Sequence, residues 1–354
     1  MVGIALLGAG IFALEQHLPA IEAAPSSFEL KAVYSRSQKS AESLASSSSS
    51  SVDVYFDTPA VEGKSLDDLL KREDIEAVVV VLPIPAQPGV IRRAVEAGKH
   101  VLSEKPVAKD VEAARGLVSW YEGEKRGELW AVAENWRYLE SLEVAAAKVW
   151  ELVTKREGRV TSFRLERFGF VAEGDKYFNT EWRKVPEYQG GFVLDGGIHF
   201  IAGLRMLLAA GGEEISSVAC FSSLLEERLV PVDTVHAVAT TQTGRNGTIA
   251  ISFGTEFKRG TQIEILTTAG SVVWTPVSVT TVVKNEKGEM VEEVKEFKAG
   301  STGVDREVVA FGEAIRRGSL EARQTPAEAL KDLEIVQGLL ESGEAKGAVK
   351  NVGP

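Results

Sequence analysis

The feature that most constrains the fold is a pair of glycines that directly follows the first apolar run of the chain. Residues 2–7 read VGIALL and residues 8–10 read GAG, and a helical pattern with Leu14, Leu18 and Ile21 on one face comes next. A buried strand that turns through glycines into a helix is typical of the first unit of a parallel α/β sheet. The start of the chain is therefore predicted to form an α/β domain.

The following hundred residues repeat this alternation of strand and helix. Helical patterns separate the further expected strands, which lie at 28–34, 52–56, 75–82, 100–103 and 129–134. Successive strand-helix units of this kind build a doubly wound parallel (Rossmann) sheet. We therefore expect a dinucleotide-binding Rossmann domain over residues 1–134.

The pattern changes character after about residue 135. Helices are expected at 139–153, 197–208 and 305–316, with glycine-containing hairpins at 245–247 and 268–270. The runs that alternate with the period of a strand are 160–168, 216–224, 235–243, 247–254, 261–267, 271–274 and 280–283. We expect residues 135–354 to form an α+β domain for substrate binding and oligomerisation, with a largely antiparallel open sheet. That sheet is a plausible face for a homodimer or homotetramer.

Composition and charge limit the classes of partner. The 354 residues include 40 Lys and Arg against 51 Asp and Glu, and the net charge of −11 is unfavourable for binding nucleic acid. Cys220 is the only cysteine, so an intrachain disulfide is excluded and a cytoplasmic location is expected. The apolar stretches at 1–14 and 77–85 are shorter than the ~20 residues of a membrane span, and the N-terminus lacks a basic secretory start. Because the four histidines and the carboxylates show no metal-ligand spacing, no metal is expected.

The glycine turn has the context that a dinucleotide-binding fingerprint requires. Gly8 allows the tight turn, and Gly10 lets a pyrophosphate approach the backbone without an intervening Cβ. Ile11 and Phe12 begin the helix, whose free N–H groups and positive dipole end favour an anion. A simple strand-to-helix turn is the alternative. We expect Gly8, Gly10, Ile11 and Phe12 to bind the cofactor.

The end of the second strand selects between the two nicotinamide dinucleotides. An acidic residue there would accept hydrogen bonds from the ribose 2′-hydroxyl of NAD. The chain instead has Ser35, Arg36 and Ser37, followed by Lys39. The serines can donate hydrogen bonds, and the guanidinium of Arg36 can pair with a 2′-phosphate and stack on adenine. NADP(H) is therefore predicted, with an ordinary exposed arginine as the alternative.

Two later strand ends are expected at the same edge of the sheet. Leu82, Pro83 and Gln87 follow the fourth strand, and Glu104 and Lys105 stand at the end of the fifth. Ligands bind at the carboxyl edge of parallel strands in such folds. We expect these residues to contact the cofactor, and Lys105 also to donate hydrogen bonds to a substrate oxygen.

The segment from residue 190 to residue 199 carries the candidate proton-transfer groups. Asp195 and His199 are four residues apart, so on a helix they share one face and the carboxylate can orient the imidazole. A histidine held in this way can exchange a proton with a carbonyl oxygen. A packed or capped helix histidine is the competing interpretation.

Together these segments resemble the Gfo/Idh/MocA family, the glucose-fructose oxidoreductase and inositol dehydrogenase family. The resemblance rests on the GAG turn, on AGKHVLSEKP at 97–106, on Trp182-Arg183 and on the GGxxxDxxxH run at 190–199, and it extends over nearly the whole chain. It implies that Lys105, Asp195 and His199 are the catalytic residues, with His199 the acid-base candidate. It also implies a cis bond between Lys105 and Pro106 and a sugar, polyol or related carbonyl substrate.

Two positions depart from the family pattern. Many relatives have a histidine near Gln87 and an aspartate where Ala202 stands, which leaves the sugar-binding details open. Tyr177, Trp182 and Arg183 precede the catalytic segment and are expected to line the substrate pocket together with Lys105, Asp195 and His199.

The residues and the resemblance together predict an NADP(H)-dependent oxidoreductase. It would move a hydride between the nicotinamide and a carbonyl or secondary alcohol carbon of a small substrate. The alternative is a non-catalytic NADP-binding regulatory or sensor protein of the same fold.

Overall fold

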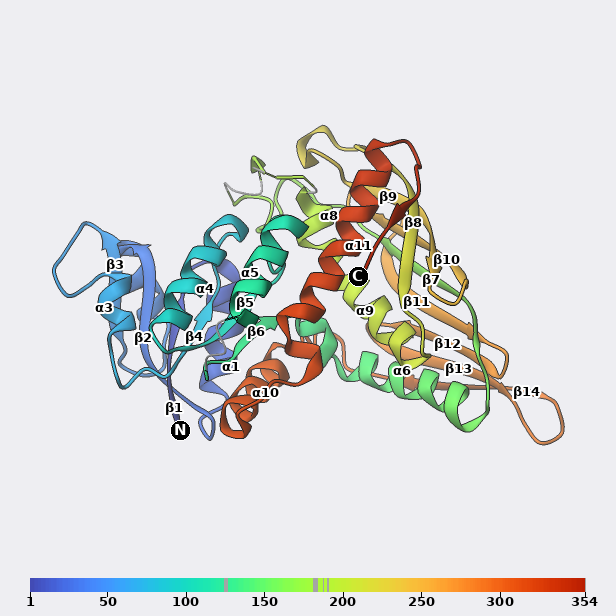
Figure 1. Ribbon diagram of the computed structural model, residues 1–354, viewed down its shortest axis with the longest axis horizontal. Helices are drawn as coiled ribbons and strands as arrows, with labels where there is room; N and C mark the ends of the chain where they lie inside the picture. The colour runs from blue at the N-terminus through green and yellow to red at the C-terminus, as the bar shows by residue number, and fades with distance from the viewer. Residues whose placement is uncertain (124–126, 181–183, 187, 190, 354) are drawn as a thin grey trace. The chain divides into compact units, whose positions relative to one another are not determined.

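The structure, a computed structural model, describes residues 1–123, 127–180, 184–186, 188–189 and 191–353 (Figure 1). The chain forms two compact units, which are Met1–Asn135 with Gly303–Leu330, and Trp136–Thr302 with Lys331–Pro354. The sequence predicts one boundary, between residues 134 and 135, and so assigns 303–330 to the second domain. These residues pack with the first unit because helix α10 (Val304–Arg317) buries Val304, Val308 and Phe311 in the core of the first sheet.

The first unit contains a parallel sheet, which confirms the predicted Rossmann architecture. Its six strands have the order β3-β2-β1-β4-β5-β6. The strands are β1 (Val2–Leu7), β2 (Phe28–Ser37), β3 (Asp53–Thr58), β4 (Ala77–Val80), β5 (His100–Glu104) and β6 (Trp130–Ala133). The side chains of β1 and β4 are buried throughout, as expected for central strands covered on both faces. The strands that follow β1 in the sequence, β2 and β3, lie on one side of it, and β4 to β6 lie on the other side. The carboxyl ends of β1 and β4 therefore form a topological switch point.

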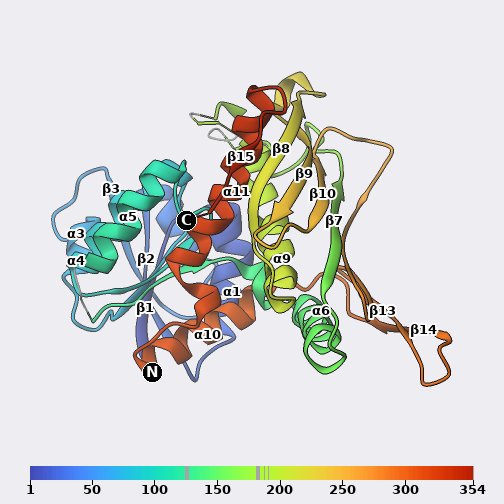
Figure 2. The same cartoon turned by 45° about the vertical axis from the view of Figure 1, so that its right-hand side comes forward.

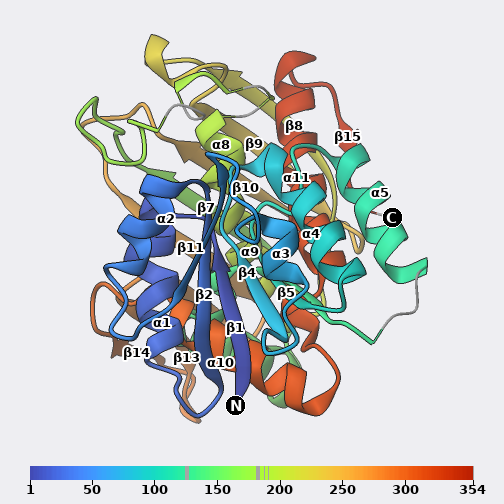
Figure 3. The same ribbon diagram turned by 90° about the vertical axis from the view of Figure 1, so that its left-hand side faces the viewer.

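Helices cover both faces of this sheet. Helices α1 and α2 lie on one side of the strands and α4 and α5 on the other (Figure 3). The helical elements up to β6 are η1 (Ala13–His17), α1 (Leu18–Glu22), α2 (Gln38–Ala45), α3 (Leu66–Leu70), η2 (Ile84–Ala86), α4 (Gln87–Glu96) and α5 (Val111–Gly123). The short η6 (Ala322–Gln324) follows α10.

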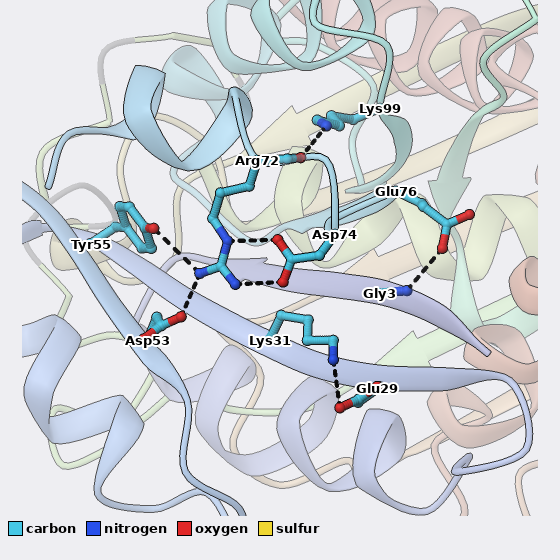
Figure 4. Close-up of polar contacts among 9 residues, drawn as sticks. All are labelled: Gly3, Glu29, Lys31, Asp53, Tyr55, Arg72, Asp74, Glu76 and Lys99. Carbon is cyan, nitrogen blue, oxygen red and sulfur yellow. Dashed lines mark hydrogen bonds and ion pairs between the residues drawn. The ribbon is translucent and has the colours of Figure 1, made fainter. Parts of the chain in front are cut away.

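A cluster of charged groups lies at the amino edge of this sheet (Figure 4). The glycine turn follows the carboxyl end of β1, so the cluster is at the opposite ends of the strands. Arg72 donates two hydrogen bonds to Asp74, at 2.9 and 2.7 Å, and another to Asp53 at 2.6 Å. The ammonium of Lys99 donates to the Arg72 carbonyl at 2.7 Å, and burial lowers the pKa of this lysine. The cluster joins the segment before β4 to the starts of β3 and β5.

The second unit contains a nine-stranded mixed sheet with the order β14-β13-β12-β11-β7-β10-β9-β8-β15. Neighbouring strands are antiparallel except β7 and β10, which confirms the largely antiparallel sheet that the sequence predicts. The strands are β7 (Val160–Phe168), β8 (Ile215–Ser223), β9 (Thr234–Thr241), β10 (Asn246–Ser252), β11 (Gly260–Thr267), β12 (Gly270–Thr275), β13 (Ser278–Lys284), β14 (Met290–Glu296) and β15 (Lys350–Asn351).

The helices of the second unit pack on one face of its sheet. Helices α6 and α9 lie along this face (Figure 2), and the indole N–H of Trp274 on β12 donates to the Ser141 hydroxyl of α6 at 3.0 Å. The Ser342 hydroxyl of α11 accepts from the backbone N–H of Cys220 on β8 at 2.8 Å. These helical elements are η3 (Asn135–Tyr138), α6 (Glu140–Trp150), η4 (Glu151–Lys155), α8 (Gly191–Asp195), α9 (Gly197–Ala210), η5 (Glu227–Leu229) and α11 (Pro326–Glu344). The first residue of η3 and the first five residues of α11 belong to the first unit.

Among the described residues, the helical run from 191 to 210 is long and apolar enough to cross a membrane. Most of this run is buried within the protein, which is the behaviour of a core helix.

The amino-edge cluster makes stability depend on pH. The hydrogen bonds from Arg72 lower the pKa of Asp74. The contribution of these hydrogen bonds to the free energy of unfolding is therefore fully present when the pH is above the ordinary aspartate pKa of roughly 4. It is lost as the pH falls through the lowered pKa that Asp74 has in the folded state. We expect Asp74→Asn to lower the melting temperature by roughly 1–3 °C at pH 7 and by nothing measurable near pH 2. Glu256→Gln, at an exposed residue of the second unit, is the control, and a pH-independent effect of Asp74→Asn would contradict this account.

Candidate functional site

The glycine turn lies at the switch point of the first sheet, as the sequence predicts. Gly8 has φ +120°, and a Cβ on it would lie 2.0 Å from the carbonyl oxygen of Val81, which follows β4. Only glycine fits this close approach. Gly10 is exposed, and nothing lies within 4 Å of the position that its Cβ would take. The turn therefore has open space beside the backbone of Gly10, at the N-terminal end of a helical segment, where a pyrophosphate can approach.

Ile11 and Phe12 are the first residues of that helical segment, and both are half-buried. The Gly10 carbonyl accepts a hydrogen bond from the Leu14 N–H at 3.1 Å, which starts the helix immediately after the turn. The ring of Phe12 packs edge-on against His17, with centroids 5.4 Å apart. The earliest N–H groups of the helix therefore come from the residues that the fingerprint assigns to the phosphates.

The end of β2 carries the predicted polar and basic residues. Ser35 is half-buried, and Arg36 and Lys39 are exposed. Within the part of the chain that the structure describes, neither Arg36 nor Lys39 makes an ion pair. The Ser37 hydroxyl accepts a weak hydrogen bond from the Ser40 N–H at 3.3 Å and caps α2. Two cations are thus available for an anion, while the hydroxyl of Ser37 already has a structural partner.

Asp57 is an acidic residue near this strand end that the sequence analysis did not consider. It lies on β3, where its Oδ2 accepts from the Tyr34 hydroxyl at 2.6 Å and its Oδ1 from the Leu66 N–H at 3.2 Å. Burial, together with this carboxylate, raises the pKa of Tyr34 above the usual tyrosine range. Asp57 accepts one hydrogen bond at each carboxylate oxygen and so forms a structural link between β2, β3 and α3.

Gln87 begins α4, directly after the loop that follows β4. The residue is 1% exposed, and in the described structure neither Nε2 nor Oε1 has a hydrogen-bond partner. Leaving a buried amide unpaired costs about 1–3 kcal/mol per group. Leu82 and Pro83 of the same loop are half-buried. The amide of Gln87 therefore has unused donor and acceptor capacity near the switch point, and its contact with the cofactor stays a prediction.

Glu104, the last residue of β5, is held by a histidine of η1. Its Oε1 lies 2.7 Å from Nε2 of His17, which is fully buried in η1. This contact fixes the strand end immediately before Lys105, which is half-buried. The peptide bond between Lys105 and Pro106 is cis, in agreement with what the family resemblance implies.

In the second unit, Asp195 and His199 lie on either side of a joint between two helices. Asp195 is the buried last residue of α8, and His199 is a half-buried residue in the first turn of α9. The predicted helix at 197–208 corresponds to α9, and the shared face of Asp195 and His199 requires that the helical spacing extends back to Asp195. Gly196 at the joint keeps right-handed helical dihedrals, and its N–H donates to the Phe192 carbonyl at 2.8 Å. The helical spacing therefore continues across the joint, which keeps the two side chains on one side of the helix.

Trp136 is a neighbour of His199 that sequence reasoning missed. Its indole stacks on the imidazole with a centroid distance of 5.8 Å and an interplanar angle of 13°. It also packs edge-on against Phe200, at 4.9 Å. A single aromatic residue 63 positions upstream gives no local signal of this contact, because it depends on tertiary packing. The stacking restricts the orientation of the imidazole ring.

Tyr177 lies in a segment that packs beside α8. Its backbone N–H donates to Oδ1 of Asp175 at 2.8 Å, and the next residue, Phe178, stacks on Phe192 of α8 at 6.5 Å. Trp182 and Arg183, the other expected substrate contacts, lie outside the described residues. Ala202 is fully buried in α9, where it is a packing residue. Among the residues that the structure places, no group of three or more His, Cys, Asp or Glu is arranged to hold a metal ion.

Both halves of the chain match one protein family. Residues 2–128 match the oxidoreductase family with an NAD-binding Rossmann fold, GFO_IDH_MocA, and residues 151–350 match its C-terminal alpha/beta domain. The chain belongs to this family and is an oxidoreductase of it. This confirms the resemblance on which the sequence analysis relied.

Individual relatives agree with this assignment. The chain is 53% identical to dehydrogenase FPY6 of Fusarium mangiferae over 99% of both proteins. An oxidoreductase structure from Thermotoga maritima superposes with a TM-score of 0.84 at 26% identity, covering 99% of this chain and 98% of the other. Levoglucosan dehydrogenase in complex with NADH and L-sorbose has the same fold, with a TM-score of 0.82 at 18% identity over 99% of both chains.

The two glycines of the turn should respond differently to the same substitution. Gly8→Ala forces a Cβ against the Val81 carbonyl at a positive φ and should lower the free energy of unfolding by roughly 1–3 kcal/mol or more. In Gly10→Ala the new Cβ lies in open space, so the free energy of unfolding should change by less than about 1 kcal/mol. Urea denaturation of both variants measures the difference. Equal stability of the two variants would contradict the close packing at Gly8.

Proposed function

We propose that the protein is an NADP(H)-dependent oxidoreductase that interconverts a carbonyl and a secondary alcohol of a small sugar, polyol or related compound. The observation that carries the cofactor choice is the end of β2, where Arg36 and Lys39 have no ion-pair partner among the described residues and Asp57 is already engaged. The family description supports a nicotinamide dinucleotide, and the levoglucosan dehydrogenase complex with NADH and L-sorbose supports the substrate class.

The residues of the first unit fit the parts of NADP. The Gly10 backbone and the N–H groups of Ile11 and Phe12 would hold the pyrophosphate, with Gly8 shaping the turn. Arg36 and Lys39 would pair with the 2′-phosphate, and Ser35 would add a hydrogen bond there. The hydroxyl of Ser37 is bonded to Ser40, so Ser37 would support the site by capping α2. Leu82, Pro83 and Gln87 would bound the nicotinamide end, where the buried amide of Gln87 offers a donor and an acceptor. Glu104, fixed by His17, would support that end.

The chemistry then divides between the cofactor and three side chains. When bound, the nicotinamide supplies or accepts the hydride. Lys105 donates a hydrogen bond to the substrate oxygen and stabilises the negative charge that develops there. His199 gives a proton to this oxygen in reduction and removes it in oxidation, while Asp195 orients the imidazole. Tyr177 would line the substrate site.

The exposed face of the second sheet supports self-association. Phe221 on β8 and Val238 on β9 are large apolar side chains, 67% and 52% exposed. An apolar sheet face of this kind favours a homodimer or homotetramer, which light scattering measures. We propose a cytoplasmic location for the enzyme, because its single cysteine, Cys220, is buried and not part of a disulfide.

Cofactor choice is tested at Arg36. Arg36→Ala removes a charge-assisted hydrogen bond to phosphate, so the KM for NADPH should rise about tenfold while that for NADH stays constant. Arg259→Ala, at an exposed arginine of the second unit, is the matched control and should change neither. An equal effect of Arg36→Ala on both cofactors would refute the assignment to the 2′-phosphate.

The proton-transfer role is tested at His199. His199→Asn should lower kcat by roughly 10²–10⁴-fold, because general acid-base catalysis is lost, and NADPH binding followed by fluorescence should stay within a factor of two. His236→Asn, on β9 of the same unit, is the control. Undiminished turnover would remove His199 from the mechanism. Binding of NADPH by the wild type without oxidation across a broad carbonyl panel would instead indicate a sensor protein.

A further inference from the structure

Arg167 is an arginine of the second unit that the proposed mechanism does not use. It is the penultimate residue of β7, on the face of the sheet that buries Phe163 and Leu165. Its guanidinium carbon lies 5.4 Å from the ring centroid of Phe200 and 5.1 Å from that of Phe253. The side chain is therefore held by aromatic contacts on the helix-covered face.

The backbone beside the guanidinium leaves room for it. A Cβ on Gly169 would lie 2.2 Å from Nη1 of Arg167, so the guanidinium occupies the space that a side chain at position 169 would take. Any residue larger than glycine there would displace the cation. The position of Arg167 thus depends on Gly169 as well as on the two phenylalanines.

Within the described residues, Arg167 has no hydrogen bond and no ion pair. Other buried arginines of this unit do have carboxylate partners, since Arg137 and Arg205 both bond to Asp332. On the same strand, exposed Arg164 pairs with Glu264 at 3.1 Å. Burial lowers the pKa of Arg167, and no neighbouring carboxylate offsets this cost. The cation-π contacts compensate only in part, because they satisfy none of the five N–H donors.

The carboxylate close to Phe253 does not serve as the missing partner. Asp233 is fully buried, and its oxygens accept hydrogen bonds from the backbone N–H groups of Leu225 and Glu226 and from the hydroxyl of Thr234. Its acceptor capacity is thus used by the loop between β8 and β9. Arg167 itself is half-buried, so part of the residue is exposed to solvent.

Arg167 lies beside the helix joint that carries the candidate catalytic residues. Phe200, one of its aromatic contacts, directly follows His199 in α9. Phe253, the other, packs against Gly196, where a Cβ would be 2.9 Å from the ring. Both rings that hold the guanidinium therefore also pack on the segment between Asp195 and Phe200.

We propose that Arg167 binds an oxyanion, a carboxylate or a phosphate, of the substrate of this oxidoreductase. Aromatic rings fix the planar fork without occupying its N–H groups, which suits bidentate recognition of an anion. The guanidinium of Arg167 then gains an anionic hydrogen-bond partner only when the substrate provides the carboxylate or phosphate. This inference rests on the proposed function and narrows its substrate class from sugars and polyols in general to acidic or phosphorylated ones.

The experiment compares anionic probes with their neutral counterpart. Calorimetric titration in the presence of NADP⁺ measures the dissociation constants of glucuronate, glucose 6-phosphate and glucose. We expect the wild type to bind one of the two anions at least tenfold more tightly than glucose. Preference for glucuronate identifies a carboxylate, and preference for glucose 6-phosphate identifies a phosphate. Equal affinity for all three compounds overturns the proposal.

Variants then assign the preference to this side chain. Arg167→Met should abolish the preference and leave glucose binding unchanged, and Arg167→Lys, which keeps the charge without the fork, should retain part of it. Arg164→Met is the matched control on the same strand and should retain all of it. A preference that survives Arg167→Met overturns the proposal, even if the melting temperature of the variant falls. If Arg167→Met unfolds the protein, a full preference in Arg167→Lys overturns the bidentate contact.

These binding measurements are independent of turnover. Loss of turnover in His199→Asn tests the proposed function, whereas the anion preference tests Arg167. An Arg167-dependent preference without any turnover would therefore contradict the proposed function alone. In an active enzyme, Arg167→Met should raise the KM of the anionic substrate at least tenfold and change kcat by less than threefold.

Discussion

The position of β1 at the centre of the parallel sheet is the constraint on which the cofactor half of the protein depends. Strand β1 pairs with β2 on one side and with β4 on the other. The chain after β1 continues to β2, whereas the chain after β4 continues to β5, on the opposite side of β1 in the sheet. The loops after β1 and β4 therefore meet at one edge, and Gly8 lies so close to Val81 that no side chain fits between them. Two residues later, the Gly10 backbone and the start of the helix have open space beside them. The ion pairs of Arg72 fix the opposite edge, so the structural and ligand-binding ends of the strands are separate.

In the second unit the corresponding constraint is aromatic packing around the joint of α8 and α9. Trp136 stacks on His199, and Phe253 lies against Gly196. These rings restrict the orientation of a half-buried imidazole and of the Arg167 guanidinium. Aromatic contacts thus help to hold the site in place.

Sequence reasoning was most successful where the signal is local. The GAG turn after a buried strand, and a strand end with Arg36 instead of a carboxylate, can be recognised within a few residues, and the structure places them at one edge of the sheet. Alternating runs also indicated most strands of the second sheet. Helix α10 was expected, but its membership of the first unit was not, because periodicity shows which face of a helix is apolar and not which core receives it.

The contacts that position the side chains of the site could not be recognised from the sequence. The contact of His17 with Glu104 joins residues 87 positions apart. Trp136 and Arg167 give no local signal, because their roles depend on which partners are near them or lacking.

The sequence by itself determined the family, the two kinds of sheet and the residue types at the candidate site, since these follow from hydrophobic period, glycine placement and short motifs. Only the tertiary structure decided which polar groups are already satisfied. Asp57 and Asp233 have partners, whereas Gln87 and Arg167 do not within the described residues. The physical reason is that hydrogen bonding and desolvation depend on neighbours that the folded chain brings together from distant positions.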